Sequence, residues 1–395
     1  MFRIIKKDKN SKARLGVLRT AHGTVKTPSY VFVGTYGQIR HLSSADIKRT
    51  KTQIIISNTF HLWDETGKSL KSKVKDSKLD TFLTRKLGLN IPTMTDSGGF
   101  QVLSLAFSNK DAAGKFLTGS RRKNTVLKRD KIKITERGVY FYQDGEKLFL
   151  GPELSMKIQS KIGADIIFAF DHITSPLDTY AYNQRAVKLT DKWALRCLRV
   201  NQNKKQMLFG IVQGGLFKDL RIRSAKSIGS MPFDGFGIGG SYTKKQIAKV
   251  LKWIVPHLPE EKPRHLLGVG KIEDIFEAVE NGMDLFDCVI PTREARHGRL
   301  YTKTGHMDIR RGYYTKDKAV IERGCGCFTC SKKVSRSKIR ELLKSPNREL
   351  NARGQRWCLL HNMWFFNKLL EDIRNSIAKW KFKEFKKKFL DRYIG

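Results

Sequence analysis

Eight short apolar runs recur along the chain, and all but the last, which ends at Pro291, end in glycine or a polar residue. The runs cover residues 31–37, 54–61, 92–99, 166–172, 208–215, 235–240, 265–270 and 285–291. Continuous apolar runs of this length are typical of parallel strands that are buried on both faces. The pattern therefore predicts an α/β fold whose sheet is covered on both sides.

The segments between these runs suit helices. Residues 152–163, 242–254 and 271–282 carry apolar side chains at helical spacing, and the first segment has Pro152 near its start and Gly163 at its end. Eight strand-plus-helix units predict a (β/α)8 TIM barrel, although alternating strands and helices are also compatible with an open doubly wound sheet. We favour the barrel because the units number eight and because polar residues lie at the C-terminal ends of strands, which converge on one mouth in a barrel.

The connection between the third and fourth runs is longer than the others. Residues 108–131 are polar and basic, and residues 138–150 predict a hairpin that turns at Asp144 and Gly145. Long loops at a barrel mouth often form lids or binding surfaces. The alternative is an insertion without a role.

The run at residues 285–291 contains one carboxylate, Asp287, and a charge inside an apolar run is costly unless it is paired or used. In a barrel, Asp96, Asp171 and Gln213 would meet Asp287 at the mouth. Two adjacent carboxylates can act as nucleophile and as acid or base at a sugar anomeric carbon. A third carboxylate with an amide could read the edge of a purine. Each aspartate taken alone is more readily explained as a helix cap or a structural ion pair, but the four polar groups together are much less easily explained in that way.

The charge of the chain is strongly positive, with 77 Lys and Arg against 37 Asp and Glu and a formal net charge of +40. Such a charge favours a polyanionic partner, and nucleic acid is the first candidate. The alternative is a lysine-rich composition that covers every solvated face. Arg293 and Arg296 follow Asp287 closely and suit a phosphate backbone. Residues 268–274 predict a helix start beside glycines, which is a candidate phosphate site or a simple tight turn.

No apolar run approaches the length needed to cross a bilayer, and the first ten residues lack the apolar segment of a signal peptide. We therefore expect a soluble cytoplasmic protein. Cysteines are kept reduced in that compartment, so the crowding of Cys325, Cys327 and Cys330 indicates a metal site more than a disulfide. Tetrahedral zinc needs a fourth ligand, and the apolar helix predicted at residues 356–374 offers Cys358 or His361.

The C-terminal residues 379–393 alternate lysines with aromatic side chains. This pattern predicts an amphipathic helix that lies on the body of the protein with its lysines in solvent. The alternative is a basic helix that faces RNA.

Several motifs together resemble the tRNA-guanine transglycosylase family, also called queuine tRNA-ribosyltransferase, and the bacterial single-polypeptide type in particular. They are DSGGFQVLSL (96–105), GADIIFAFD (163–171), GIVQGG (210–215), GIGG (237–240), LLGVG (266–270), DLFDCVIPTREARHGRLYT (284–302), CGCFTC (325–330) and LLHN (359–362). The match runs in order from about residue 13 to residue 375.

The resemblance implies an irregular (β/α)8 barrel over residues 1–310, with the basic insertion at about 108–150. It also implies a zinc-binding subdomain with C-terminal helices over residues 311–395. The implied reaction replaces the guanine at wobble position 34 of tRNA by a 7-deazaguanine, preQ1 or queuine, in queuosine tRNA modification. The implied partners are the tRNA anticodon loop, the deazaguanine base and a second copy of the chain in a homodimer.

The resemblance also implies roles for individual residues. Asp287 is the implied nucleophile on the ribose, and Asp96 is the implied acid and base. The implied base-binding residues are Asp96, Ser97, Gly98, Gly99, Phe100, Asp171, Gln213, Gly240 and Leu267. The implied RNA-binding residues are Gly268, Val269, Gly270, Lys271, Ile272, Glu273, Asp274, Thr292, Arg293, Glu294, Ala295 and Arg296. One structural Zn²⁺ per chain is implied at Cys325, Cys327, Cys330 and His361, which selects His361 over Cys358.

Two stretches depart from the bacterial pattern. His172 and Ile173 stand where the family usually has Glu and Cys, and residues 241–245 carry lysines in place of an acidic residue. A cationic aminomethyl base such as preQ1 would be less well served by these residues than a neutral one. The alternatives to a tRNA enzyme are a DNA deazaguanine transglycosylase, a hydrolase that leaves an abasic site, and a non-catalytic RNA-binding subunit of a two-chain transglycosylase. Such a subunit would be expected to lose its nucleophile, whereas Asp96 and Asp287 are both present.

Overall fold

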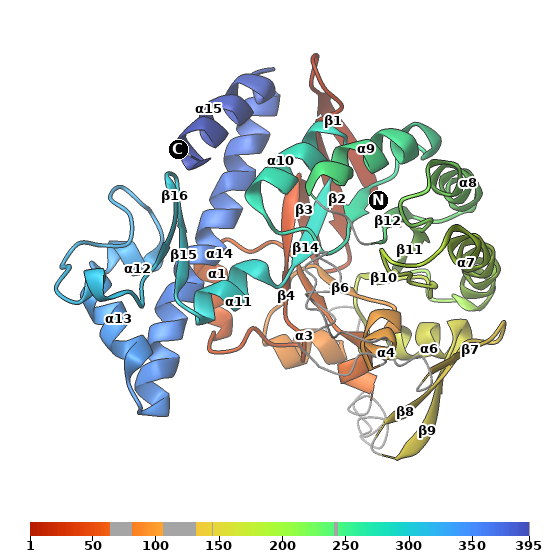
Figure 1. The fold of residues 1–395 in the computed structure, drawn as a ribbon, viewed down its shortest axis with the longest axis horizontal. Helices are drawn as coiled ribbons and strands as arrows, with labels where there is room; N and C mark the ends of the chain where they lie inside the picture. The colour runs from red at the N-terminus through yellow and green to blue at the C-terminus, as the bar shows by residue number, and fades with distance from the viewer. Residues whose placement is uncertain (64–80, 106–131, 144, 241–243, 395) are drawn as a thin grey trace.

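The computed structural model describes residues 1–63, 81–105, 132–143, 145–240 and 244–394, and its centre is a closed barrel of eight parallel strands (Figure 1). The strands are β4 (Ser29–Val33), β5 (Ile55–Ser57), β6 (Thr93–Thr95), β10 (Ile166–Phe168), β11 (Met207–Val212), β12 (Gly235–Ile238), β13 (Arg264–Leu266) and β14 (Leu285–Cys288). Each strand overlaps one of the eight predicted apolar runs. Pairing of β6 with β10 and of β14 with β4 closes the ring, which confirms the TIM barrel over the open sheet.

Both faces of the barrel strands are buried. Phe168, Phe209 and Leu285 belong to one apolar cluster, which fills the barrel interior. Their sequence neighbours belong to a second cluster between the strands and the surrounding helices, as the alternation of side chains along a strand requires. Gly237 of β12 leaves room for an interior ring, because a Cβ atom there would lie 2.9 Å from Phe168 Cε1.

Helices follow the strands around the barrel. They are α1 (Ser44–Arg49), α3 (Phe82–Leu87), α4 (Gly99–Leu105), α6 (Pro152–Ile162), α7 (Tyr180–Val200), α8 (Lys218–Gly229), α9 (Lys244–Ile254), α10 (Ile272–Glu280) and α11 (Ile290–Arg296), and a 3₁₀ turn, η2 (Val255–His257), follows α9. The helices predicted at residues 152–163, 242–254 and 271–282 are thereby confirmed, except that residues 242 and 243 lie outside the described residues. Helix α6 begins at Pro152 and ends at Gly163, whose φ of +76° suits a residue without a side chain.

An N-terminal sheet that the sequence pattern did not predict covers one end of the barrel. It consists of β1 (Phe2–Lys7), β2 (Arg14–Thr20) and β3 (Gly23–Thr27) in antiparallel order. His22 Nδ1 lies 2.8 Å from Asp165 Oδ1, and Arg14 lies 2.5 Å from Asp284 Oδ2, all four side chains being buried. Asp165 and Asp284 precede β10 and β14, so the sheet lies at the amino ends of the strands. The carboxyl ends, where barrel enzymes place their sites, are at the other end.

The long connection after β6 contributes a second small sheet. Strands β7 (Ile132–Ile134), β8 (Val139–Gln143) and β9 (Glu146–Leu150) are antiparallel, which confirms the predicted hairpin. The basic segment 108–131 and the turn residue Asp144 lie outside the described residues. Val139, Phe141 and Leu150 are buried, so this sheet packs into the main core.

The C-terminal part adds a short hairpin and four helices. They are β15 (Arg299–Thr302), β16 (Gly305–Asp308), α12 (Phe328–Ser331), α13 (Arg336–Lys344), α14 (Arg348–Ala378) and α15 (Phe382–Ile394), with a 3₁₀ turn, η3 (Gly312–Tyr314), between the hairpin and α12. Helix α14 runs along the flank of the barrel in Figure 1 and packs its Phe366 ring against Tyr30 of β4. Its 31 residues contain the apolar helix predicted at 356–374.

Helix α15 confirms the prediction of an amphipathic C-terminal helix. Phe382 and Phe389 are buried against the Phe276 ring of α10. Lys386 pairs with Glu277 and Glu280, and the neighbouring Lys383, Lys387 and Lys388 are exposed. Among the described residues, no helix is both long enough and apolar enough to span a bilayer.

Candidate active site and metal centre

Polar side chains and glycines occupy one arc of the barrel mouth. Asp96 follows β6, Asp171 follows β10, Gln213 follows β11, Gly239 and Gly240 follow β12, Leu267 follows β13, and Asp287 lies near the end of β14. Strands β6, β10, β11, β12, β13 and β14 are consecutive neighbours in the ring. The barrel therefore brings together residues that are up to 191 positions apart, counted from 96 to 287 in the sequence.

Asp96 is held in a network of donors. Its Oδ1 accepts hydrogen bonds from the backbone N–H groups of Thr59 and Gly98, both at 3.0 Å, and its Oδ2 accepts one from Asn58 Nδ2 at 2.7 Å. Burial of the carboxyl raises the pKa of Asp96 to about 7, the backbone donors oppose this change, and the charge of Asp287 raises the pKa further. A carboxyl group that titrates near neutrality is suited to give and take a proton.

Asp171 and Gln213 form a second polar pair. Gln213 Nε2 donates to Asp171 Oδ2 at 2.6 Å, and Ser97 Oγ donates to Asp171 Oδ1 at 3.3 Å. Burial raises the pKa of Asp171 to about 6, against the opposing effect of these two donors. Gln213 Oε1 is buried and accepts no hydrogen bond within the described part of the chain. The pair thus offers a carboxylate and an unused amide acceptor to a ligand with adjacent N–H donors.

A glycine keeps the Gln213 amide in place. A Cβ atom at Gly239 would lie 2.5 Å from Gln213 Nε2, so any side chain there would displace the amide. Glycine at position 239 therefore allows the Gln213 amide to lie close to the backbone at the end of β12.

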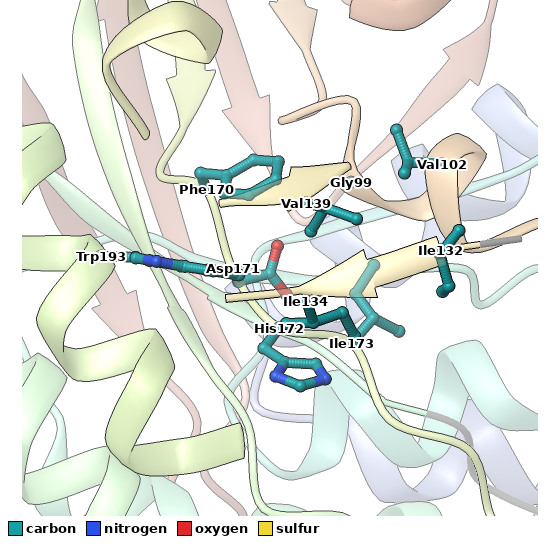
Figure 2. Close-up of a pocket in the computed structure, with 10 residues that line it drawn as sticks. All are labelled: Gly99, Val102, Ile132, Ile134, Val139, Phe170, Asp171, His172, Ile173 and Trp193. Atoms are coloured by element: carbon teal, nitrogen blue, oxygen red, sulfur yellow. The ribbon is translucent and has the colours of Figure 1, made fainter. Parts of the chain in front are cut away.

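A small pocket adjoins Asp171, whose carboxylate lies amid the lining side chains (Figure 2). The other lining residues are mostly apolar and are Gly99, Val102, Ile132, Ile134, Val139, Phe170, His172, Ile173 and Trp193. Three of them come from β7 and β8, so the sheet after the basic segment forms one wall. These apolar walls keep water from Asp171, which is the physical cause of its raised pKa.

His172 and Ile173, which depart from the family pattern, both lie at this pocket. The backbone N–H of His172 donates to Thr190 Oγ1 at 3.0 Å, and the ring Nε2 of His172 lies 3.1 Å from the Tyr182 hydroxyl; Thr190 and Tyr182 both belong to α7. The substituted residue is therefore tied to helix α7.

Asp287 has a partner that the sequence pattern did not single out. His265 Nε2 lies 2.7 Å from Asp287 Oδ1, and the Gly268 N–H donates to the same oxygen at 3.3 Å. His265 is fully buried, whereas 16% of the Asp287 side chain is exposed. The signal that could have revealed it was available, because His265, like Asp287, is a polar residue inside a predicted apolar strand.

The predicted RNA-binding residues divide between surface and interior. Gly268, Lys271 and Arg293 are exposed, Glu273, Glu294 and Arg296 are partly buried, and Val269, Gly270, Ile272, Asp274, Thr292 and Ala295 are buried. The pKa of Arg296 is lowered by burial and then by the positive charges of Arg40 and Arg293. An anionic ligand would relieve this repulsion among three cations. The sequence pattern did not point to Arg40.

The remaining base-binding predictions also lie around the mouth. Phe100, on α4, and Leu267 are partly buried, and Ser97 is buried. Gly98 has a φ of +81° and Gly240 a φ of +116°, conformations that a residue with a side chain rarely adopts.

Three thiols and one imidazole converge in the C-terminal part. The ligand atoms of Cys325, Cys327, Cys330 and His361 all lie within 4.8 Å of one another, and the four residues are buried. His361 Nδ1 lies 3.3 Å from Cys327 Sγ, while Nε2 lies 2.7 Å from the Tyr301 backbone oxygen, to which it donates. This cluster can hold a metal ion, and Cys358 is not part of it. Sulfur and imidazole ligands in such a set suit zinc.

The family model described as queuine tRNA-ribosyltransferase matches residues 8–394. A queuine tRNA-ribosyltransferase from Clostridium acetobutylicum is 40% identical over 410 aligned positions that cover all of both chains. The protein of the same name from Halothermothrix orenii is 37% identical, covering 100% of this chain and 98% of the relative. That from Fusobacterium nucleatum is 38% identical, covering 98% and 97%.

Proposed function

The chain belongs to the queuine tRNA-ribosyltransferase family, and we propose how its barrel mouth performs the reaction of a tRNA-guanine transglycosylase. The enzyme exchanges guanine in tRNA for another base, and we assign the exchange to wobble position 34 and to a 7-deazaguanine. The observation that carries the proposal is the meeting of Asp96 and Asp287 in one site, where the charge of Asp287 raises the pKa of Asp96.

The exchange proceeds in two displacements. In the first, a carboxylate oxygen of Asp287 attacks C1′ of the ribose, the bond from C1′ to guanine breaks, and protonated Asp96 gives its proton to the departing base. In the second, the ionised Asp96 takes a proton from the incoming base. That base then attacks C1′ and releases Asp287 as a carboxylate. Each bond formed matches one bond broken, so the exchange needs no nucleotide triphosphate.

The base lies between Asp96 and the pair of Asp171 and Gln213. The unused Gln213 Oε1 and the Asp171 carboxylate accept from ring and exocyclic N–H groups. The backbone of Ser97, Gly98, Gly99 and Gly240 borders the base, and the side chains of Phe100 and Leu267 contact its faces.

The tRNA anticodon loop binds across α11 and the start of α10. Arg293 and Arg296 neutralise phosphates beside Asp287, and Lys271 does so at the N-terminal end of α10. The surrounding residues from Gly268 to Asp274 and from Thr292 to Ala295 shape this surface. We further propose that the enzyme works in the cytoplasm as a homodimer.

We propose that Cys325, Cys327, Cys330 and His361 hold one structural zinc ion. The ion stabilises the C-terminal part when bound and takes no part in the chemistry. The hydrogen bond that His361 Nε2 donates to the Tyr301 backbone oxygen orients the imidazole so that Nδ1 faces the thiols.

The decisive experiment offers labelled guanine to bulk tRNA and to duplex DNA with the same enzyme. We expect label in tRNA alone, and no label with the Asp287→Asn variant. Unlabelled guanine, preQ1 and queuine offered in parallel to labelled tRNA identify the base that displaces the label. Label in DNA alone would indicate the DNA enzyme, and strand scission without incorporation would indicate a hydrolase.

A further inference from the structure

We propose that His265 is a positioning residue for the nucleophile, and that it selects Oδ2 of Asp287 as the attacking oxygen. The inference rests on the proposed function of Asp287. It is drawn from the contact between His265 Nε2 and Asp287 Oδ1, at 2.7 Å.

The barrel itself fixes the relative position of the two side chains. Strands β13 and β14 are parallel neighbours, and His265 is in register with Leu285. Asp287 lies two residues beyond Leu285, so it projects from the same face as His265. Both groups therefore stand on hydrogen-bonded strands instead of on loops, and rigid elements hold functional groups with the least positional error.

The surroundings of His265 favour a neutral ring that donates from Nε2. The residue is fully buried, and its ring lies edge-on to Phe168 with 5.4 Å between the ring centroids. Nδ1 is buried and has no hydrogen-bond partner among the described residues. A protonated ring would leave an Nδ1–H donor buried without an acceptor, which is costly. The neutral Nε2–H tautomer places its one donor against the Asp287 carboxylate.

The result is an asymmetric carboxylate. Oδ1 accepts hydrogen bonds from His265 Nε2 and from the Gly268 N–H at 3.3 Å. No hydrogen bond to Oδ2 is found from the part of the chain that the structure describes. Fixing Oδ1 prevents rotation of the carboxylate and leaves Oδ2, the less hydrogen-bonded oxygen, to form the bond with C1′.

The test measures how fast the protein forms a covalent complex with tRNA in a single turnover, without an added base, by denaturing electrophoresis. We expect His265→Leu to slow complex formation about 10- to 100-fold, because a donor to a charged group is lost. We expect the apparent dissociation constant for tRNA to change less than about threefold, because His265 is fully buried. His265→Gln should recover most of the rate, since its amide nitrogen can donate from nearly the same position.

A matched control separates positioning from general stability. His22→Leu removes a buried histidine that pairs with Asp165 at the opposite end of the barrel. This variant should lower the unfolding temperature and leave the rate of complex formation per folded molecule unchanged.

Three outcomes would overturn the inference. They are a His265→Leu rate equal to that of the wild type, equal losses in the Leu and Gln variants, and a loss in His22→Leu that matches the loss in His265→Leu. Failure of the proposed function is distinguishable, because it would appear as an undiminished covalent complex in Asp287→Asn.

Discussion

Asp96 and Asp287 show how surroundings divide labour between two identical side chains. Asp96 lies among backbone donors in a partly buried niche where its pKa is raised to about 7 by burial and by Asp287. Asp287 is fixed through one oxygen by His265 and Gly268, and part of its side chain reaches the open mouth. The first arrangement suits proton transfer, and the second suits attack on the sugar.

The raised pKa of Asp96 predicts how the first displacement depends on pH. In the proposed mechanism the protonated form gives a proton to the departing guanine, and this form predominates only below about pH 7. The rate of covalent complex formation should therefore fall about tenfold per pH unit above pH 7. The Asp96→Asn variant should be slow and should lack this transition. A wild-type rate that is flat from pH 5.5 to pH 8.5 would contradict the assignment.

The same pKa has a consequence for stability. Asp96 retains its proton in the folded state up to about pH 7, whereas the unfolded chain releases it near pH 4, so ionising Asp96 destabilises the fold as pH rises between these values. The free energy of unfolding of the wild type should fall from pH 5 to pH 8, whereas that of Asp96→Asn lacks this contribution. Over this pH range the variant should therefore become more stable relative to the wild type by at most about 3 kcal/mol. The partial exposure of Asp96 reduces this figure. Urea titrations at the two pH values measure the difference. An increase in the stability of the wild type relative to Asp96→Asn from pH 5 to pH 8 would contradict the raised pKa.

At the scale of elements, the barrel strands were predictable because they lie in short, largely apolar runs that recur eight times along the chain. The N-terminal sheet was not, since β1 alternates exposed and half-buried residues and leaves no such run. Helix α7 was not predicted either, although its 21 residues bury one face against the barrel. Short-range patterns identify elements that are buried on both sides more readily than elements that cover a single face.

The site was predictable in the same uneven way. The convergence of Asp96, Asp171, Gln213 and Asp287 was predictable because strand ends meet at one mouth in any parallel barrel. His265 could have been noticed as a polar residue inside an apolar run, but its pairing with Asp287 depends on the register of β13 with β14, which the sequence does not show. Arg40 escaped because it lies in a loop that only the folded chain brings near α11.

The cluster of Cys325, Cys327, Cys330 and His361 is linked through helix α14 to strand β15 and to the start of helix α11. His361 donates to the Tyr301 oxygen on β15, and the adjacent Asn362 donates to the backbone oxygen of Pro291 at the start of α11 at 3.1 Å. The cluster therefore supports the helix that carries Arg293 and follows Asp287. Loss of the metal should loosen α11 before it loosens the barrel.

Cysteine variants test this link. Cys327→Ser should lose most of its bound zinc, measured by atomic absorption, and should unfold at a temperature lower by roughly 5–10 °C. The rate of amide hydrogen exchange in α11 and β15 should also be higher in Cys327→Ser than in the wild type. Cys358→Ala is the matched control, because Cys358 is buried one turn from His361 without belonging to the cluster. Equal zinc loss in both variants would contradict the ligand assignment.

At the scale of the whole molecule, the net charge of +40 makes tRNA binding sensitive to salt. A cation that contacts phosphate contributes to this dependence, whereas a cation on a solvated face does not. Arg293 on α11 is exposed beside the mouth, and Lys338 on α13 is exposed and pairs with Glu341. Substitutions of these two residues therefore distinguish the effect of a specific phosphate contact from the effect of net charge on tRNA binding.

Arg293→Ala should weaken tRNA binding and reduce the slope of log affinity against log salt concentration by about 0.7–1. Lys338→Ala should leave the slope unchanged, and neither substitution should alter stability by more than about 0.5 kcal/mol. Fluorescence anisotropy with labelled anticodon stem-loop at several salt concentrations measures both slopes. Equal slopes in the two variants would remove Arg293 from the RNA contact.

The central claim is that Asp287 becomes covalently joined to the ribose while the base is exchanged. Mass spectrometry of the protein after incubation with tRNA, nuclease digestion and proteolysis tests it directly. We predict a ribonucleotide adduct lacking its base on the peptide that contains Asp287, and its disappearance when guanine is added before the reaction is stopped. An adduct on a different residue, or base exchange without any adduct, would contradict the account.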